Sequence, residues 1–253
     1  MKKERLDNLL VERGLVPSRE RAKALITAGK VLVNGQKIDK PGADVNADTQ
    51  VQLISGLPYV SRGGLKLEGA LKAFGIDPKG IVVMDVGAST GGFTDCALQR
   101  GAKKVYAVDV GYGQLAWELR KDPRVVNLER TNIRYLRRGA IEEKDGVDLI
   151  LIDTSFISIE KFLLQLLGFL KSRGSLVALI KPQFEVGKGE VGKGGVVKDP
   201  ALHQRVIERI STFSLGLGLS IRGVVESPLR GPKGNKEFFI HLQKMGIERS
   251  AWR

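Results

Sequence analysis

The chain has 253 residues, 42% of them hydrophobic, so it is long enough to bury one large core or a small and a medium one. Its single cysteine excludes an internal disulfide and a cysteine-based zinc cluster, and two histidines leave little for a metal site, so we expect no metal and a reducing, cytoplasmic setting. With 41 Lys and Arg against 28 Asp and Glu, the net charge of +13 predicts a polyanionic partner, nucleic acid being the leading candidate and plain solubility charge the alternative.

Residues 1–57 predict a small α+β unit. Apolar residues at helical spacing predict helices over 4–13 and 18–29, the second capped by Ser18. Asn34-Gly35 between alternating apolar residues predicts a β-hairpin, and a further strand is expected over 51–54. The unit has basic side chains that we expect to contact RNA phosphates: Arg5, Arg19, Arg21, Lys23, Lys30 and Lys37.

Residues 58–64 contain proline and glycine and predict a linker, and residues 65–245 predict a second domain followed by a tail, 246–253. In that domain apolar strands alternate with helices, the strands being expected at 81–87, 104–111, 124–129, 148–155, 175–182, 220–226 and 237–242. This alternation predicts an α/β, Rossmann-like fold, with a mostly parallel sheet covered by helices on both faces.

The chain shows no sign of a membrane segment. Its start, MKKERLDNLL, is charged, and no apolar run approaches the roughly 18 residues of a span. The apolar segment 159–170 is shorter and has charges nearby, so we expect it to be a buried covering helix. We therefore expect a soluble protein without a signal peptide and without a membrane partner.

Residues 84–93, MDVGASTGGF, run from a strand through glycines into a helix, which lets the backbone approach a ligand closely. The G-x-x-x-G-G spacing differs from the dinucleotide fingerprint, which disfavours an NAD enzyme. Asp109 ends the next strand, where a carboxylate accepts hydrogen bonds from ribose hydroxyls.

The glycine turn and Asp109 together resemble motif I and its acidic partner in S-adenosylmethionine-dependent methyltransferases. The resemblance implies S-adenosylmethionine as cofactor. Asn132 falls where such enzymes contact adenine, although it is as well suited to capping a turn. The implied cofactor-binding residues are Asp85, Gly87, Ala88, Ser89, Gly91, Gly92, Phe93, Asp109, Val110 and Asn132.

The segment 184–199, FEVGKGEVGKGGVVKD, nearly matches a P-loop, but Gly194 stands where a hydroxyl should bind magnesium. A P-loop follows its strand directly and opens a helix, whereas here Pro182 and further residues intervene after the expected strand. We therefore predict a cationic loop whose lysines meet phosphate on an RNA backbone rather than on ATP.

Methyl transfer to a ribose hydroxyl needs a group that accepts the hydroxyl proton, and a lysine held by carboxylates is suited to this role. Four candidates lie near the expected strand ends, where open α/β sheets bind ligands: Lys66, Asp153, Lys181 and Glu237. Alternatively, Lys66 is a solvated helix residue and Glu237 protects an edge strand.

The order lysine, aspartate, lysine, glutamate resembles the K-D-K-E tetrad of FtsJ-type ribose 2'-O-methyltransferases. The stretches VSRGGLKL, DVGASTGGFTD, DTSFIS, IKPQFE and SPLRGPKGNKEF resemble the TlyA family, once labelled hemolysins, and residues 5–35 resemble the alpha-L RNA-binding module of a ribosomal protein. The resemblance implies a seven-stranded sheet with its last strand antiparallel, and S-adenosylmethionine-dependent 2'-O-methylation of cytidine in ribosomal RNA of either or both subunits.

On the family's usual account, Lys181 accepts the 2'-OH proton, Asp153 and Glu237 position that lysine, and Lys66 orients the nucleophile. The expected partner is ribosomal RNA or a ribosomal subunit, and both a monomer and a homodimer stay open. Phe156 and Phe184 are expected either to stack on a displaced base or to pack in the core. The rival functions are a non-enzymatic RNA-binding protein with an inactive methyltransferase fold and, disfavoured, a hemolysin.

Overall fold

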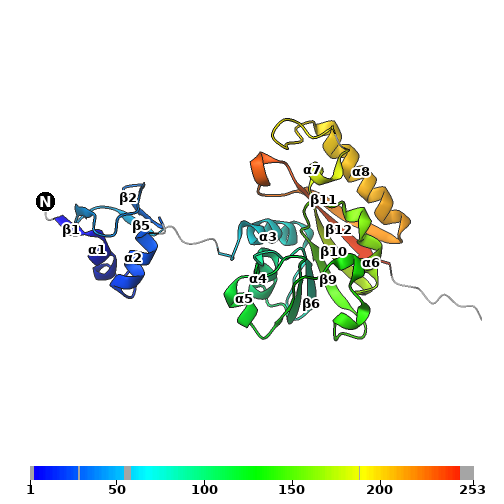
Figure 1. Ribbon diagram of the computed structural model, residues 1–253, viewed down its shortest axis with the longest axis horizontal. Coiled ribbons are helices and arrows are strands. Elements are labelled where there is room, and N and C mark those ends of the chain that lie inside the picture. Colours follow the sequence, from blue (N-terminus) through cyan, green and yellow to red (C-terminus); the bar gives the residue numbers. More distant parts are fainter. Residues whose placement is uncertain (1–2, 28, 54–57, 188, 246–253) are drawn as a thin grey trace, which may run out of the picture. The chain divides into compact units, whose positions relative to one another are not determined.

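Figure 1 shows the computed structural model, which describes residues 3–27, 29–53, 58–187 and 189–245. The chain divides into two compact units, Met1–Pro58 and Tyr59–Arg253. In the described part of the chain, the first unit has one hydrophobic core, and the second has two, one on each face of its sheet. Within the described residues, no helix is both long and apolar enough to cross a membrane.

The first unit packs two short helices against a small antiparallel sheet. Helices α1 (Leu6–Glu12) and α2 (Arg19–Thr27) bury leucine and isoleucine side chains against β2 (Val31–Val33), and β2 lies between β3 (Gln36–Ile38) and β5 (Val51–Leu53). The predicted hairpin is confirmed: Asn34 and Gly35, with φ of 49° and 78°, form the turn between β2 and β3.

Both helices of the first unit are shorter than the sequence predicts, and one strand pair is additional. Strand β1 (Lys3–Arg5) pairs with β4 (Asp44–Asn46). Each of these two strands has three residues, so the pair was not predictable from periodicity.

The second unit contains a seven-stranded sheet in the order β11-β12-β10-β9-β6-β7-β8 among the described residues. The strands are β6 (Val82–Val86), β7 (Lys104–Val108), β8 (Val125–Leu128), β9 (Val147–Ile152), β10 (Leu170–Ile180), β11 (Leu219–Glu226) and β12 (Phe238–Lys244). Strand β12 runs antiparallel to both of its neighbours, and the pairs formed by β10, β9, β6, β7 and β8 are parallel. The predicted fold class is therefore confirmed.

Helices cover both faces of this sheet, as Figure 1 shows. Side chains of α3 (Arg62–Phe74), α4 (Gly92–Gln99) and α5 (Trp117–Lys121) pack with Val83, Leu149 and Val177. Side chains of α6 (Leu163–Leu167) and α8 (Pro200–Gly216) pack with Met84 and Ile150. Successive strand residues thus point into two different cores, which is why the central strands read as continuous apolar runs.

The predicted linker 58–64 is wrong over most of its length. Tyr59 is 7% exposed and packs in the core, and Ser61 caps α3 by accepting a hydrogen bond from the Gly63 amide. Gly64 lies in the first turn of α3, where a Cβ would come within 2.2 Å of the Tyr59 ring. The glycine allows close packing of the helix on this ring and does not mark a flexible connection.

The single covering helix predicted over 159–170 is also wrong in its extent. A 3₁₀ turn, η3 (Ile159–Lys161), precedes α6, and Leu170 already opens β10. Most apolar side chains of the segment are buried as expected, but Leu164 is 65% exposed. Polar residues in the first half of β10, LKSRG, hide this strand from a search for apolar runs.

Candidate active site

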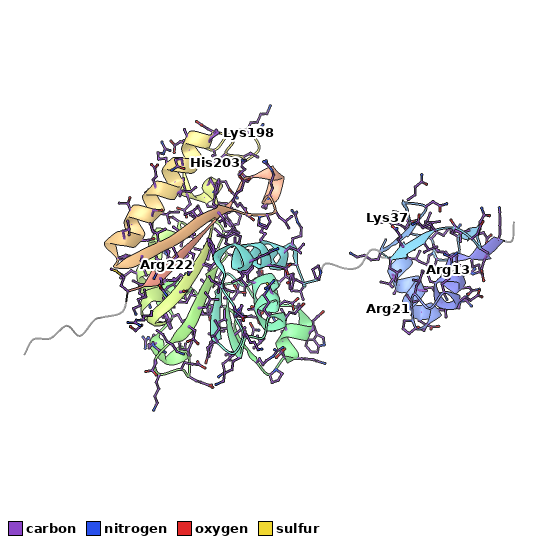
Figure 2. All side chains as sticks on the ribbon, turned by 180° about the vertical axis from the view of Figure 1, so that it is seen from behind. Arg13, Arg21, Lys37, Lys198, His203 and Arg222 are labelled. Atoms are coloured by element: carbon purple, nitrogen blue, oxygen red, sulfur yellow. The ribbon has the colours of Figure 1, made fainter. Side chains whose placement is uncertain are left out.

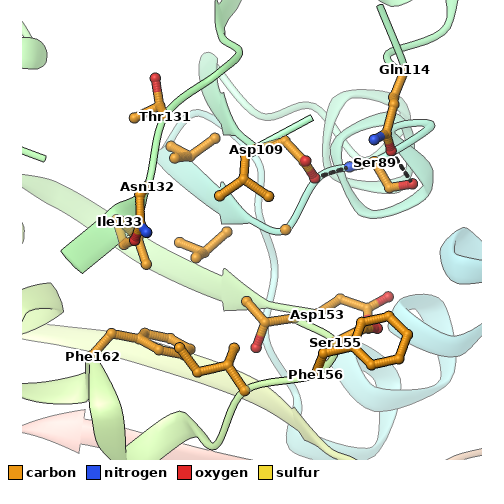
Figure 3. A pocket seen from close by; sticks show the side chains of 16 residues that line it. Ser89, Asp109, Gln114, Thr131, Asn132, Ile133, Asp153, Ser155, Phe156 and Phe162 are labelled. Carbon is orange, nitrogen blue, oxygen red and sulfur yellow. Dashed lines mark hydrogen bonds between the residues drawn. The ribbon is translucent and has the colours of Figure 1, made fainter. Parts of the chain in front are cut away.

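A cavity of about 390 Å³ lies beyond the carboxyl ends of β6, β7 and β9. In parallel sheets these ends form the usual ligand-binding edge. Figure 3 shows Asp109 and Asn132 along one side of the cavity, and Asp153, Ser155 and Phe156 along the other. Its remaining walls include Val86, Val108, Ile133 and Phe162, so the cavity is mostly apolar with a few polar groups, which is the usual character of a small-molecule site.

Gly87 shapes the floor of this cavity, and its position requires glycine. Its φ is 87°, and a Cβ there would come within 2.6 Å of the Asp153 carbonyl oxygen. Only glycine adopts this conformation at low cost while letting the turn after β6 pass so close to the end of β9.

The other glycines of the turn serve the packing of helices. Gly91 is the N-cap of α4 and has a φ of 98°, and a Cβ on Gly92 would come within 2.1 Å of the Ser61 hydroxyl at the start of α3. Ala88, Gly91, Gly92 and Phe93, which the sequence predicts to bind cofactor, are not among the residues lining the cavity. Gly87, Ser89, Asp109, Val110 and Asn132 do line it.

Asp109 organises the loops at the mouth of the cavity. Its two carboxylate oxygens accept hydrogen bonds from the Ser89 amide at 2.8 Å and the Gly111 amide at 2.7 Å. Asn132 fits both readings of the sequence, because its side chain accepts a hydrogen bond from the Arg134 amide as a turn cap and also lines the cavity. Gln114, which the sequence analysis missed, lines the cavity and accepts a hydrogen bond from the Ser89 hydroxyl.

Asp85 is fully buried in β6 rather than exposed to the cavity. One of its carboxylate oxygens, Oδ2, accepts hydrogen bonds from the Thr94 amide and hydroxyl, while Oδ1 has no partner among the described residues. Burial, opposed by the Thr94 bonds, raises the pKa of Asp85 to about 7. The folded protein thus binds a proton here that the unfolded chain releases near pH 4.

Asp85→Asn is expected to flatten the dependence of stability on pH. Because the pKa of Asp85 is higher in the folded state, the free energy of unfolding falls as pH rises from about 4 to 7 and levels off above it. A difference of about 3 pKa units corresponds to at most roughly 4 kcal/mol, which is several degrees in melting temperature. The asparagine can still accept both Thr94 bonds but cannot ionise.

The measurement is the melting temperature of wild type minus that of the variant between pH 5.5 and 8. This difference removes the contributions of His241, whose pKa burial lowers, and Glu185, whose pKa burial raises. The exposed substitution Asp77→Asn serves as control and should leave the slope unchanged. A difference that does not vary with pH would show that Asp85 keeps an ordinary pKa.

The four predicted catalytic side chains form two ion pairs. Lys66 Nζ lies 2.6 Å from Glu237 Oε2, and Lys181 Nζ lies 2.6 Å from Asp153 Oδ1. Lys181 also donates a hydrogen bond to the Ser155 hydroxyl at 2.9 Å, and Gln183 donates a long one to Glu237 at 3.4 Å. Ser155 and Gln183 were missed from the sequence, although each lies two residues beyond a predicted residue.

Sheet register brings these pairs to one edge. Ile180, the last residue of β10, is paired with Phe238, the first residue of β12. Lys181 directly follows Ile180 and Glu237 directly precedes Phe238, so the two side chains belong to the same end of the strand pair. The Asp153 amide, just past β9, donates to Val86 at the end of β6. Asp153 also lines the cavity, so the Lys181 pair adjoins it.

Burial excludes the alternative readings of two of these residues. Lys66 is 9% exposed and Glu237 is 1% exposed, and β12 lies inside the sheet between β10 and β11. Lys66 is therefore not a solvated helix residue, and Glu237 does not protect an edge strand. Two opposite charges withdrawn from water require each other, because removing either leaves a buried unpaired charge.

An aromatic pair stands beside the Lys181 pair. The rings of Phe156 and Phe184 have centroids 4.8 Å apart, and the Lys181 ammonium lies 5.9 Å from the Phe184 ring centroid. Phe156 is 89% exposed, with a φ of 65°, so core packing is wrong for this residue. A large exposed ring on a strained backbone at the mouth of a cavity indicates a contact surface for a ligand.

In the first unit, two of the predicted RNA contacts also hold the fold. Arg5 and Arg19 both pair with the carboxylate of Asp7, which is fully buried, at 3.0 and 3.1 Å. The hydrogen bond from Arg5, against the opposing effect of burial, lowers the pKa of Asp7 to about 2. Arg21, Lys23 and Lys37 are exposed and Lys30 is half-buried.

The sheet order, the reversed strand β12 and the ligand cavity at the carboxyl edge define a Rossmann-like methyltransferase unit, joined to a small α+β unit. Residues 59–244 match the model of the FtsJ-like methyltransferase family, and residues 4–51 match the S4 domain. The chain belongs to the FtsJ-like methyltransferase family and has an N-terminal S4 domain, with relatives named TlyA.

Three similar proteins illustrate the relationship. A Bacillus subtilis protein, YqxC, described as a candidate rRNA methyltransferase, is 51% identical over 97% of this chain and 87% of its own length. The 16S/23S rRNA (cytidine-2'-O)-methyltransferase TlyA of Mycobacterium tuberculosis is 50% identical over 96% of this chain and 90% of its own. A solved structure of a candidate hemolysin from Streptococcus thermophilus shares 44% identity over 97% of this chain and 90% of its own, with a TM-score of 0.74.

Proposed function

We propose that this protein transfers a methyl group from S-adenosylmethionine to the 2'-oxygen of cytidine in ribosomal RNA. The observation that carries the proposal is the Lys181–Asp153 ion pair, which adjoins a cavity suited to a nucleoside cofactor. The 50% identity to the mycobacterial TlyA supports the choice of cytidine and of ribosomal RNA. The S4 domain at residues 4–51 and the match of about a quarter of the chain to the small ribosomal subunit protein uS4, 30% identical over 84 residues, support RNA binding.

The cavity residues fit S-adenosylmethionine. Asp109, at the end of β7, would bind the ribose hydroxyls, Asn132 and the apolar wall beside it would contact the adenine, and the bare backbone at Gly87 leaves room for the rest of the molecule. When bound, this cofactor supplies an electrophilic methyl group on a sulfonium.

The chain's own task is to hold the ribose and to accept the proton that its 2'-OH loses as the oxygen forms its new bond to carbon. Lys181 in its neutral form is the acceptor, and the ammonium that it becomes on taking the proton is stabilised by Asp153 at 2.6 Å and by the Ser155 hydroxyl. Lys66, held by Glu237, would orient the 2'-oxygen. The exposed ring of Phe156, backed by Phe184, would stack on the base of a nucleotide lifted from its helix.

Incubation with isotopically labelled S-adenosylmethionine and ribosomal subunits from cells that lack this protein tests the proposal. We expect label in 2'-O-methylcytidine after digestion of RNA from at least one subunit. Label in the RNA but on a base rather than a ribose would contradict the role of Lys181. No label in RNA of either subunit would contradict the enzyme function and leave a non-enzymatic RNA-binding protein.

A further inference from the structure

A second cavity, of about 290 Å³, lies away from the cofactor cavity and is lined by four lysine and arginine side chains and a histidine. Lys198 comes from the Gly- and Lys-rich segment before α8, His203 comes from α8, and Arg230, Lys233 and Lys236 come from the segment before β12. Figure 2 shows Lys198 and His203 close together at one end of this unit, beside the loop that precedes β12. We call it the basic pocket, and define it by these five residues.

The cations of the basic pocket are poorly compensated by the protein. Lys236 pairs with Glu226 at 3.2 Å. Within the residues that the structure describes, Lys198, Arg230 and Lys233 have no carboxylate partner. Like charges that converge on one hollow repel each other, and an anion placed among them removes this repulsion.

The walls of the basic pocket are fixed by one buried amide. Asn235 is 2% exposed, and its side chain accepts a hydrogen bond from the Val197 amide and donates to the carbonyls of Gly195 and Pro232. It therefore joins the glycine-rich segment to the segment before β12. A matching bond runs from the His203 ring, whose Nε2 donates to the Val197 carbonyl at 2.9 Å. A pocket whose backbone is held in advance loses little entropy when a ligand binds.

The glycines that nearly match a P-loop lie just before residues 196–198, which form this wall. The Gly192 amide donates to the Val196 carbonyl, and Gly194 and Gly195 have φ of 79° and 82°, so the chain reverses tightly and no helix begins there. A Cβ on Gly195 would lie 3.6 Å from the Lys233 ammonium. The Lys233 ammonium therefore lies close to the glycine-rich backbone, and Lys233 lines the pocket together with Lys198.

The basic pocket adjoins the catalytic residues through Glu237. Lys236 is the residue before Glu237, and Gly231 packs so closely on the Glu237 carboxylate that a Cβ there would come within 1.9 Å of it. The carbonyl of Arg230 accepts a hydrogen bond from Arg62, one turn of α3 before Lys66. A strand of RNA that delivers a ribose to Lys66 and Lys181 has a phosphate on either side of that ribose, and the basic pocket, whose Lys236 precedes Glu237, is placed to receive one of them.

We propose that the basic pocket binds a backbone phosphate of the substrate RNA next to the nucleotide that is methylated. The identity of the ligand, RNA, rests on the proposed function. The pocket itself is formed by residues that do not belong to the proposed catalytic set. Lysine and arginine are the usual phosphate contacts, and they position a strand without reading its sequence. The pocket therefore contributes to the affinity for RNA and to the position of the strand in the site. The nucleotide to be methylated is selected by other residues.

The test compares the double variant Lys198→Ala/Lys233→Ala with Lys79→Ala/Lys103→Ala, which removes the same charge from exposed positions before β6 and β7, at the opposite edge of the sheet. Binding of each to fluorescently labelled ribosomal RNA is measured between 50 and 300 mM KCl without S-adenosylmethionine. The pocket variant should lower the slope of log affinity against log salt by about 1 for each lysine that contacts phosphate, and the control variant should not.

The possible results distinguish a failure of the phosphate-binding proposal from a failure of the proposed methyltransferase function. An unchanged salt slope in the pocket variant, with wild type still methylating ribosomal RNA, would overturn the pocket alone. A reduced slope with no methylation by wild type would support the pocket and contradict the enzyme. A third arm titrates inorganic phosphate against melting temperature: stabilisation of wild type but not of the pocket variant at submillimolar phosphate, with an unchanged RNA slope, would assign the pocket to a free anion and overturn the RNA assignment.

Discussion

Replacing Lys181 by methionine is expected to lower the rate of methyl transfer by about 10²- to 10⁴-fold, the usual contribution of a positioned base, while S-adenosylmethionine binds nearly as before. Methionine keeps much of the apolar stem and removes only the amine that we propose as the proton acceptor. Cofactor affinity should survive because Lys181 is not among the residues lining the cofactor cavity. Single-turnover transfer to ribosomal subunits measures the first quantity, and calorimetry measures the second.

Strand β10 contains its own control for this experiment. Lys171 Nζ lies 2.7 Å from Asp148 Oδ1, so the same two strands, β9 and β10, are joined by a lysine–aspartate pair at their other ends. Lys171→Met should leave transfer unchanged, since that pair is remote from the cavity. Loss of cofactor binding in Lys181→Met would assign this lysine to the cofactor instead of the proton, and transfer at the wild-type rate would remove it from the chemistry.

The strand ends were predictable from the sequence because the central strands are buried on both faces. Such strands are apolar throughout, and a charged residue directly after one, as Asp153 follows LILI, stands out. Because parallel strands end at the same edge of a sheet, these residues can be predicted to lie near one another even when their contacts are not known. The first half of β10 was not predictable in this way because it is polar. The start of α3 was not predictable either, because its glycines, one of which packs on Tyr59, resemble a linker.

The pairing of the candidate residues could not be read from the chain. Lys66 and Glu237 are 171 positions apart, and Lys181 and Asp153 are 28 apart, so only the folded sheet selects these partners. The roles of the glycines could not be distinguished from the motif either. Gly87 lines the cavity, whereas Gly91 and Gly92 allow helices to pack closely. The basic pocket was visible only as an excess of lysine and glycine.

The buried Lys66–Glu237 pair is expected to be required for activity. For stability, we expect that removing one partner is costly and that replacing both partners by apolar residues is not. Glu237→Leu removes the carboxylate and leaves the Lys66 ammonium, 9% exposed, without a counter-charge. Breaking a buried pair in this way typically costs about 3–5 kcal/mol. For a unit of this size the melting temperature should fall by roughly 6 to 20 °C.

The double variant Lys66→Met/Glu237→Leu should recover most of that loss, because two apolar side chains of similar volume can replace a buried ion pair at little or no cost in stability. Methyl transfer should nevertheless stay at the background level in the double variant, as in each single variant, since no group then orients the 2'-oxygen. Melting curves and single-turnover transfer on the four members of this cycle separate the two effects. If the double variant methylated RNA at the wild-type rate, the pair would be a structural element alone. If it stayed as unstable as Glu237→Leu, the ion pair would stabilise the fold in its own right, and its retention would need no catalytic explanation.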